Sequence, residues 1–223
     1  MTSFKAERDT MIESQIRPNA VTDPELLKAL AETPREIFVP PSLRSLAYMD
    51  APLRVEAARD GNPARYLLAP MVFAKLAQIA RVRRTERVLD VGPATGYSTA
   101  ILARLAKSVV ALECDAGLAA LAKDALAAQG VQNAELAIGP LNLGVPERAP
   151  YDVIFMNGRL ACAPDKLLDQ LAPGGRLIAV TGSETSAKAR IFANVDSSVQ
   201  ETIEFDANAD LLPGFESRKI FAF

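Results

Sequence analysis

The apolar positions of this chain recur with two different periods, one typical of strands and one of helices. Short apolar runs predict five buried strands, at 88–91, 109–112, 135–138, 151–156 and 176–181. Helical spacing beside them predicts helices over 97–105, 116–129 and 165–171. Because strands that alternate with helices are typical of an α/β fold, we predict a doubly wound, mostly parallel sheet.

The two ends of the chain depart from this alternation. Toward the C-terminus, residues 198–205 and 217–223 have the pattern of two further strands after a last helix at 185–192, which predicts an antiparallel C-terminal edge. Helical patterns also precede the first strand, at 4–17, 22–32 and 69–80, separated by short extended segments. We therefore predict a helical N-terminal extension, residues 1–80, packed on a core of residues 81–223 as one structural unit.

The first strand of the predicted sheet ends in a turn that contains glycine. Asp90 is followed by Gly92, Ala94 and Gly96, and the next helix begins directly afterwards. A glycine lets backbone come close to a ligand because it has no Cβ. Glu113 stands at the tip of the next strand, where a carboxylate can accept hydrogen bonds from both hydroxyls of a ribose. The alternative is a turn without a ligand and a glutamate that faces water.

Charge and hydropathy narrow the classes of partner. The formal net charge is −2 and the pI is about 5.4, so we expect no nucleic acid held by a broad basic face. No apolar run approaches the roughly 20 residues that span a bilayer. The first residues also lack the apolar centre of a signal peptide. We therefore expect no membrane contact and a cytoplasmic location.

Histidine is absent from the sequence, and there are two cysteines. The missing imidazole excludes the commonest general base, the Ser-His and Cys-His nucleophile arrangements and the usual zinc ligand. Cys114 and Cys162 are far apart and lack metal-ligand spacing, so we expect two buried, unpaired thiols and no metal site. Methyl transfer to a group that is already an anion is one reaction that needs no such base.

The turn from Asp90 to Gly96, D-x-G-x-A-x-G, resembles the first motif of class I S-adenosylmethionine-dependent methyltransferases. A narrower resemblance, to the protein-L-isoaspartate O-methyltransferases, covers roughly residues 10–180. It rests on segments in fixed order: Met11-x-x-x-Gln15-Ile16, Val21–Pro24, Pro34-Arg35-Glu36-x-Phe38-Val39-Pro40, Ala47-Tyr48-x-Asp50 and Leu171–Leu177. The N-terminal segments are specific to that family, whereas the later ones are shared by many methyltransferases.

This resemblance implies a Rossmann-like methyltransferase fold with S-adenosylmethionine as cofactor. It places the methionine part of the cofactor over the turn and the ribose on Glu113. The residues it implies for the cofactor site are Asp90, Gly92, Ala94, Gly96, Glu113, Cys114, Pro140 and Leu141. The implied substrate is a protein or peptide that carries an isoaspartyl carboxylate, with a small-molecule carboxylate and a homodimer left open. The implied role is protein repair, and an ionised carboxylate needs no general base at neutral pH.

Three positions depart from the family pattern. The family's T-x-S-x-P segment is aligned here by Pro70, so Tyr66 stands at the threonine position and Leu68 at the serine position. Leucine has no donor for a carboxylate. Pro140 stands where methyltransferases of this group usually have an aspartate for the adenine, and Ala94 replaces a glycine, which would be strained at positive φ.

No catalytic residue is assigned from the sequence. The candidates to replace the missing hydroxyls are Arg65, Tyr66 and Asn157, each of which has an ordinary structural alternative at a helix start or a strand end. Two other functions also stay open at this point: a methyltransferase with a different substrate, and a non-catalytic member that keeps the fold as a cofactor-binding module or a scaffold.

Overall fold

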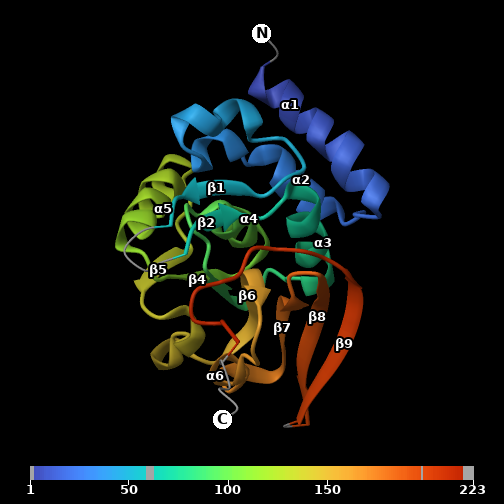
Figure 1. The fold of residues 1–223 in the computed structure, drawn as a ribbon, viewed down its shortest axis with the longest axis vertical. Helices are drawn as coiled ribbons and strands as arrows, with labels where there is room; N and C mark the ends of the chain where they lie inside the picture. The colour runs from blue at the N-terminus through green and yellow to red at the C-terminus, as the bar shows by residue number, and fades with distance from the viewer. Residues whose placement is uncertain (1–2, 59–62, 197, 218–223) are drawn as a thin grey trace, which may run out of the picture.

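A seven-stranded sheet forms the centre of the molecule in the computed structural model, which describes residues 3–58, 63–196 and 198–217. The strand order is β5-β4-β3-β6-β7-β8-β9 (Figure 1). The strands are β3 (Arg87–Val91), β4 (Ser108–Glu113), β5 (Ala134–Ile138), β6 (Tyr151–Leu160), β7 (Leu171–Ser183), β8 (Ser186–Val195) and β9 (Ser198–Asp206). Strands β5 to β7 of this order pair in parallel, whereas β8 and β9 are antiparallel. The predicted doubly wound α/β fold with an antiparallel edge is therefore confirmed.

The two faces of the sheet bury alternate residues of each strand. Val88, Val153 and Phe155 belong to a core shared with α3 (Pro70–Ala80), α4 (Tyr97–Leu105) and α5 (Ala116–Ala128). Their neighbours Leu89 and Ile154 belong to a second core on the opposite face, which includes α6 (Asp165–Leu168). A strand that is buried on both faces is apolar at every position, which explains the short continuous apolar runs in the sequence.

The N-terminal extension packs onto the first of these cores. Its elements are α1 (Phe4–Met11), η1 (Ile12–Ile16), η2 (Arg17–Asn19), α2 (Pro24–Glu32), η3 (Arg35–Phe38), η4 (Pro41–Leu46), β1 (Leu53–Glu56) and β2 (Arg65–Leu67). Asp23 caps α2, because its carboxylate accepts hydrogen bonds from the N–H groups of Glu25 and Leu26. Helix α2 packs on α3 and α4, so its apolar stripe faces the sheet layer.

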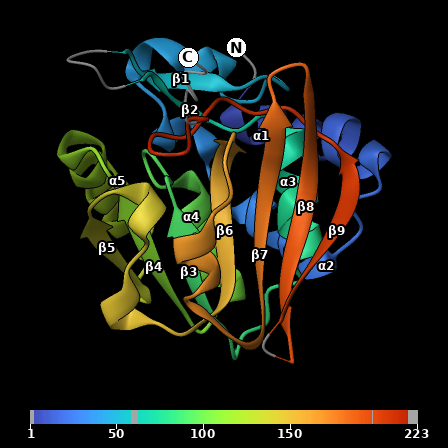
Figure 2. The same cartoon turned by 60° about the horizontal axis from the view of Figure 1, so that its bottom comes forward.

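The β1–β2 hairpin lies across the carboxyl ends of the parallel strands. Figure 2 shows this hairpin above the tips of β3, β4 and β6, together with the red segment that follows β9. That segment, residues 207–217, is joined to β6 by hydrogen bonds from Arg159 N–H to Asp210 C=O (2.8 Å) and from Leu212 N–H to Arg159 C=O (3.0 Å). Two parts of the chain that are far apart in sequence therefore cover one end of the sheet.

One sequence-based prediction about the C-terminal part of the sheet is wrong. The segment predicted as a helix at 185–192 belongs, from Ser186 onward, to strand β8, because it pairs with β7 along its length and buries Ala187 and Ala189 on one face. Alanine favours helices in isolation, but pairing with a central strand overrides that preference. The antiparallel edge is accordingly β8–β9. The strand predicted at 217–223 lies outside the described residues, apart from Ser217.

Two further predictions concern the exposure of the cysteines and the presence of helices that could cross a membrane. Cys114 is exposed and Cys162 is partly exposed, so the predicted burial of the two thiols is wrong. Within the described part of the chain, no helix has both the length and the apolar character that crossing a membrane requires.

Candidate active site

The turn after β3 lies where the sheet changes direction. Strand β3 pairs in parallel with β4 on one side and with β6 on the other, and the connections lead outward from it in both directions. Open α/β sheets bind ligands in the crevice at such a point. The Gly92 N–H donates to Leu112 C=O (2.8 Å), and Gly96, at φ +93°, begins α4. The glycine turn predicted from the sequence is therefore at the edge of the sheet where open α/β folds bind ligands.

Ala94 adopts the left-handed conformation that favours glycine. Its φ is +52°, its side chain is fully buried, and its N–H donates to Glu113 Oε2 (2.9 Å). For a residue with a Cβ, this region costs roughly 1–2 kcal/mol. The backbone strain expected from alanine at position 94 is thus present, and the hydrogen bond to Glu113 helps to keep Ala94 in this conformation.

Asp90 is the second buried acid of the site. Its carboxylate accepts hydrogen bonds from Ser98 Oγ (2.8 Å), Thr99 Oγ1 (2.6 Å) and Asn157 Nδ2 (2.6 Å). Burial raises the pKa of Asp90 to about 6, although these three donors oppose the rise. Asn157, which was a candidate for substrate binding, therefore holds Asp90 and the Val91 carbonyl.

We predict a pH-dependent contribution of Asp90 to stability. Because its pKa is raised in the folded protein, Asp90 stabilises the fold fully below pH 4, and this contribution is lost as the pH rises through about 6. Thermal unfolding of the wild type and of Asp90→Asn should show a difference, up to roughly 3 kcal/mol, that favours the wild type at pH 4.5 and declines by pH 7. A difference that does not change with pH would contradict this prediction.

Glu113 is at the tip of β4 and is fully enclosed. Its carboxylate binds both Nη atoms of Arg65 and accepts from three backbone N–H groups, those of Ala94, Cys114 and Asp115. The side chains of Arg65 and Glu113 are 5% and 0% exposed. Arg65 Nη2 also donates to Gly92 C=O (3.1 Å). Arg65, a candidate for substrate binding in the sequence, is therefore a partner of the carboxylate expected to bind ribose.

The space above the glycine turn is filled by side chains of the chain itself. A Cβ added to Gly92 would lie 2.8 Å from Leu212 Cδ2, 3.1 Å from Arg65 Nη2 and 3.3 Å from Leu141 Cδ1. A cavity next to Arg65, Cys114 and Pro213 holds about 30 Å³. Ligand pockets have volumes of roughly 300–1,000 Å³. In this conformation, the residues around the turn do not fit S-adenosylmethionine.

The remaining candidate residues surround this filled region. Cys114 is in contact with Arg65. Although the residue as a whole is exposed, partial burial of its sulfur together with Glu113 raises the pKa of the thiol to about 11, so the thiol is protonated at neutral pH. Leu141 is buried beside Gly92, whereas Pro140 is exposed at the start of η5 (Leu141–Leu143). Tyr66 and Leu68, together with Asn157, line a second small cavity of about 10 Å³.

Sequence reasoning missed two residues of this site. Leu212 lies between the two strands predicted at 198–205 and 217–223, in a stretch that has the composition of a loop, and nothing in its spacing indicates a return to the sheet. Arg35 was noted as part of a family motif, but its position is unusual: its fully buried guanidinium donates to Ala47 C=O (2.9 Å) and Leu68 C=O (2.7 Å). An arginine in a short segment between two prolines, Pro34 and Pro40, is the one signal that could have drawn attention to it.

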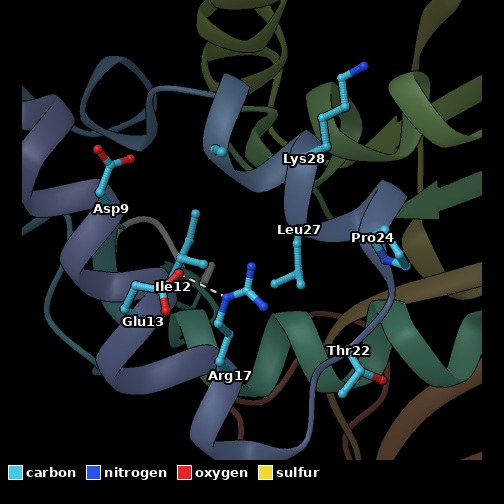
Figure 3. A pocket seen from close by; sticks show the side chains of 9 residues that line it. Asp9, Ile12, Glu13, Arg17, Thr22, Pro24, Leu27 and Lys28 are labelled. Atoms are coloured by element: carbon cyan, nitrogen blue, oxygen red, sulfur yellow. Dashed lines mark hydrogen bonds and ion pairs between the residues drawn. The ribbon is translucent and has the colours of Figure 1, made fainter.

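A larger groove, of about 420 Å³, lies on the N-terminal extension and not at the turn. Figure 3 shows Ile12 and Leu27 facing each other across it, with the Glu13–Arg17 ion pair on one side. All its lining residues fall within positions 9–31, and the ion pair joins exposed side chains one helical turn apart. This groove is therefore separate from the candidate active site.

Comparisons with known proteins agree with the motifs. The family model described as "Protein-L-isoaspartate(D-aspartate) O-methyltransferase (PCMT)" matches residues 6–207. A protein-L-isoaspartate O-methyltransferase from Synechococcus sp. (strain JA-2-3B'a(2-13)) is 37% identical over 183 residues, which are 82% of this chain and 72% of that one. Protein-L-isoaspartate O-methyltransferase 1 from Rhodopseudomonas palustris (strain HaA2) is 37% identical over 84% of this chain and 74% of its own.

Two solved structures agree with the fold. One protein-L-isoaspartate O-methyltransferase has a TM-score of 0.79 and 26% identity, and the match covers 93% of this chain and 66% of that chain. A Plasmodium falciparum protein, solved in complex with S-adenosyl-L-homocysteine, has a TM-score of 0.76 over 95% of this chain and 99% of its own. At 16% identity, this second likeness shows the fold alone. Because the family model spans both the N-terminal extension and most of the sheet, the chain belongs to the protein-L-isoaspartate O-methyltransferase family.

Proposed function

We propose that the protein is an S-adenosylmethionine-dependent carboxyl methyltransferase that acts on isoaspartyl residues of proteins or peptides. One observation carries this proposal: the family match extends from residue 6 to residue 207. The sheet alone would support many methyltransferases, because one fold hosts many activities. The N-terminal extension is the part specific to this family, and the match includes it.

The chemistry of the chain suits this reaction. The reaction converts an ionised carboxylate into a methyl ester, and the cofactor of the family supplies the methyl group. No proton has to be removed from the substrate, so the absence of histidine from the sequence is no obstacle. The requirements that remain are orientation of the carboxylate and exclusion of water, which a site beneath a hairpin and a C-terminal segment can provide.

Within this proposal, Glu113 holds the ribose, and the turn from Asp90 to Gly96 holds the methionine part of the cofactor. Cys114, Pro140 and Leu141 are proposed to border the adenosine. Pro140 cannot accept a hydrogen bond through its side chain, so the adenine amine needs another partner. A cytoplasmic location, a homodimer and the division at residue 80 stay predictions. The same holds for a small carboxylate as an alternative substrate.

The proposal is tested with a pair of peptides that differ at one linkage. A peptide with an isoaspartyl residue and the same peptide with normal aspartate are incubated with the protein and with methyl-labelled S-adenosylmethionine. We expect label only in the isoaspartyl peptide, in a form that alkaline treatment releases as methanol. If the protein binds the cofactor but the isoaspartyl peptide stays unlabelled, the proposed substrate is wrong.

Tyr66 is the candidate best placed to replace the missing serine and threonine hydroxyls. Arg65 is paired with Glu113, and Asn157 is paired with Asp90, whereas no described residue hydrogen-bonds the Tyr66 hydroxyl. Tyr66 lies on β2 beside Leu68 and is half-buried. A hydroxyl there can donate a hydrogen bond to a substrate carboxylate.

We predict that Tyr66→Phe lowers kcat/KM for the isoaspartyl peptide by roughly 10-fold or more, because a hydrogen bond to a charged group is lost. Phenylalanine keeps the ring, so the melting temperature should be unchanged. Tyr151→Phe is a matched control, because the Tyr151 hydroxyl bonds Val145 C=O inside the second core, away from the turn. Equal activity of wild type and Tyr66→Phe would remove Tyr66 from the site.

A further inference from the structure

The ribose anchor of this protein already has an internal cation. Arg65 gives Glu113 two N–H donors, and three backbone N–H groups supply the others. A carboxylate offers about four lone-pair sites, so the hydroxyls of a ribose have no free position on Glu113 while Arg65 is in place. Among the described residues, Arg65 is the cation that contacts both this carboxylate and the backbone of the glycine turn.

Leu212 occupies the space next to this ion pair. It is 2% exposed, and its Cδ2 is the atom nearest to an added Cβ at Gly92. Its Cγ would lie 2.6 Å from an added Cβ at Gly158, so the absence of a side chain at residue 158 is what allows this close approach. Backbone hydrogen bonds from residues 210–215 to β6 and to Ala161, directly after it, hold the segment in this position.

We propose that Arg65 and Leu212 form an internal plug, which competes with the cofactor for the crevice above the turn. Arg65 occupies the ribose position on Glu113, and Leu212 occupies the adjoining space over Gly92. The proposal rests on the proposed function, because it assumes that the crevice is the S-adenosylmethionine site. It assigns Arg65 a role opposite to a substrate ligand: its side chain has to leave Glu113 before the cofactor binds.

The two parts of the plug are kept in place by different interactions. The Arg65–Glu113 pair is buried, so salt screens it weakly, and its separation requires a new partner or water for each charge. Leu212 is held by packing, by its own backbone hydrogen bond to Arg159 C=O and by the backbone bonds of its neighbours. The apparent affinity for the cofactor is the intrinsic affinity reduced by the fraction of molecules with an open crevice. Removing either part should therefore tighten cofactor binding.

The test is calorimetric titration of S-adenosylmethionine into the full chain and three variants. Arg65→Ala should bind the cofactor roughly 10- to 100-fold more tightly than wild type, since a charge-assisted hydrogen-bond pair no longer competes. Leu212→Ala should show a smaller gain in the same direction, and it tests the plug even where Arg65→Ala folds poorly. Arg84→Ala is the matched control, because Arg84 forms an exposed ion pair with Glu25 on the surface.

The outcomes separate the plug from the proposed function. Tight and equal binding by wild type, Arg65→Ala and Leu212→Ala would overturn the plug and leave the methyltransferase proposal intact. No binding by any of the four proteins, together with no methyl transfer to the isoaspartyl peptide, would overturn both. Weak binding by wild type and by Arg84→Ala, with tighter binding by the other two variants, is the result that the plug requires.

Discussion

Replacing Glu113 with alanine is expected to lower the free energy of unfolding by about 3–5 kcal/mol, because it leaves the buried Arg65 guanidinium without its anion. The Glu113 side chain is 0% exposed, so no water replaces it without rearrangement. The change also removes the acceptor of three backbone N–H groups, those of Ala94, Cys114 and Asp115. Urea-induced unfolding at pH 7 measures the loss. Glu147→Ala, at an exposed position on η6 (Pro146–Arg148), should change stability by less than about 0.5 kcal/mol.

The reverse truncation should cost less. In Arg65→Ala, Glu113 keeps the three backbone donors, so its charge stays partly compensated, and we expect a loss of about 1–2 kcal/mol. The double variant Arg65→Ala/Glu113→Ala should be more stable than the sum of the two single changes predicts. Each single change leaves one buried charge without its partner, whereas the double change removes both charges. If the changes in the free energy of unfolding are additive, the interaction between Arg65 and Glu113 does not contribute to stability.

Glu113→Ala should also abolish binding of S-adenosylmethionine in calorimetric titration, including in the Arg65→Ala background, where the crevice is open. This comparison separates loss of the ribose anchor from loss of the fold, since the double variant is expected to be the better folded of the two proteins that lack Glu113. Unchanged affinity would place the ribose elsewhere in the crevice.

The local part of this site could be predicted from the sequence. Strand β3, the glycine turn, α4 and β4 follow one another along the chain, and each has its own period or turn residues. Because a parallel pair requires a crossover connection, the position of Glu113 beside the turn follows from this order. The strain at Ala94 could also be anticipated as a condition on φ, and its φ of +52° meets that condition.

The distant part of the site could not be predicted in this way. Arg65 is 48 residues from its partner Glu113, and Leu212 reaches Gly92 only after β8 and β9 have returned the chain to the carboxyl end of the sheet. Periodicity describes which face of an element is buried, but it does not say which distant side chain covers it. The same limit explains strand β8: its alanines indicate a helix locally, and only its pairing with β7 makes it a strand.

The buried arginine of the extension gives the second large effect. Arg35 is fully buried, and burial lowers its pKa from the ordinary value. Its Cζ lies 4.6 Å from the centroid of the Tyr97 ring, which gives a cation–π contact, and no described carboxylate forms an ion pair with it. Its hydrogen bond to Leu68 C=O joins the extension to the segment that adjoins the crevice. Arg35 therefore links three segments of the chain, at Ala47, Leu68 and Tyr97.

Arg35→Met is expected to lower the free energy of unfolding by about 2–5 kcal/mol, because the carbonyls of Ala47 and Leu68 lose their donors inside the protein. Methionine fills most of the volume, so the effect reports the lost hydrogen bonds and ring contact rather than a cavity. Arg35→Lys should recover little of the loss, since one ammonium group cannot reproduce the two-pronged geometry of a guanidinium. Arg44→Met, at an exposed position in η4, should stay within about 0.5 kcal/mol of wild type in the same urea titration. Full stability of Arg35→Met would show that the two carbonyls find other partners, and that the extension is held to the crevice by its apolar contacts alone.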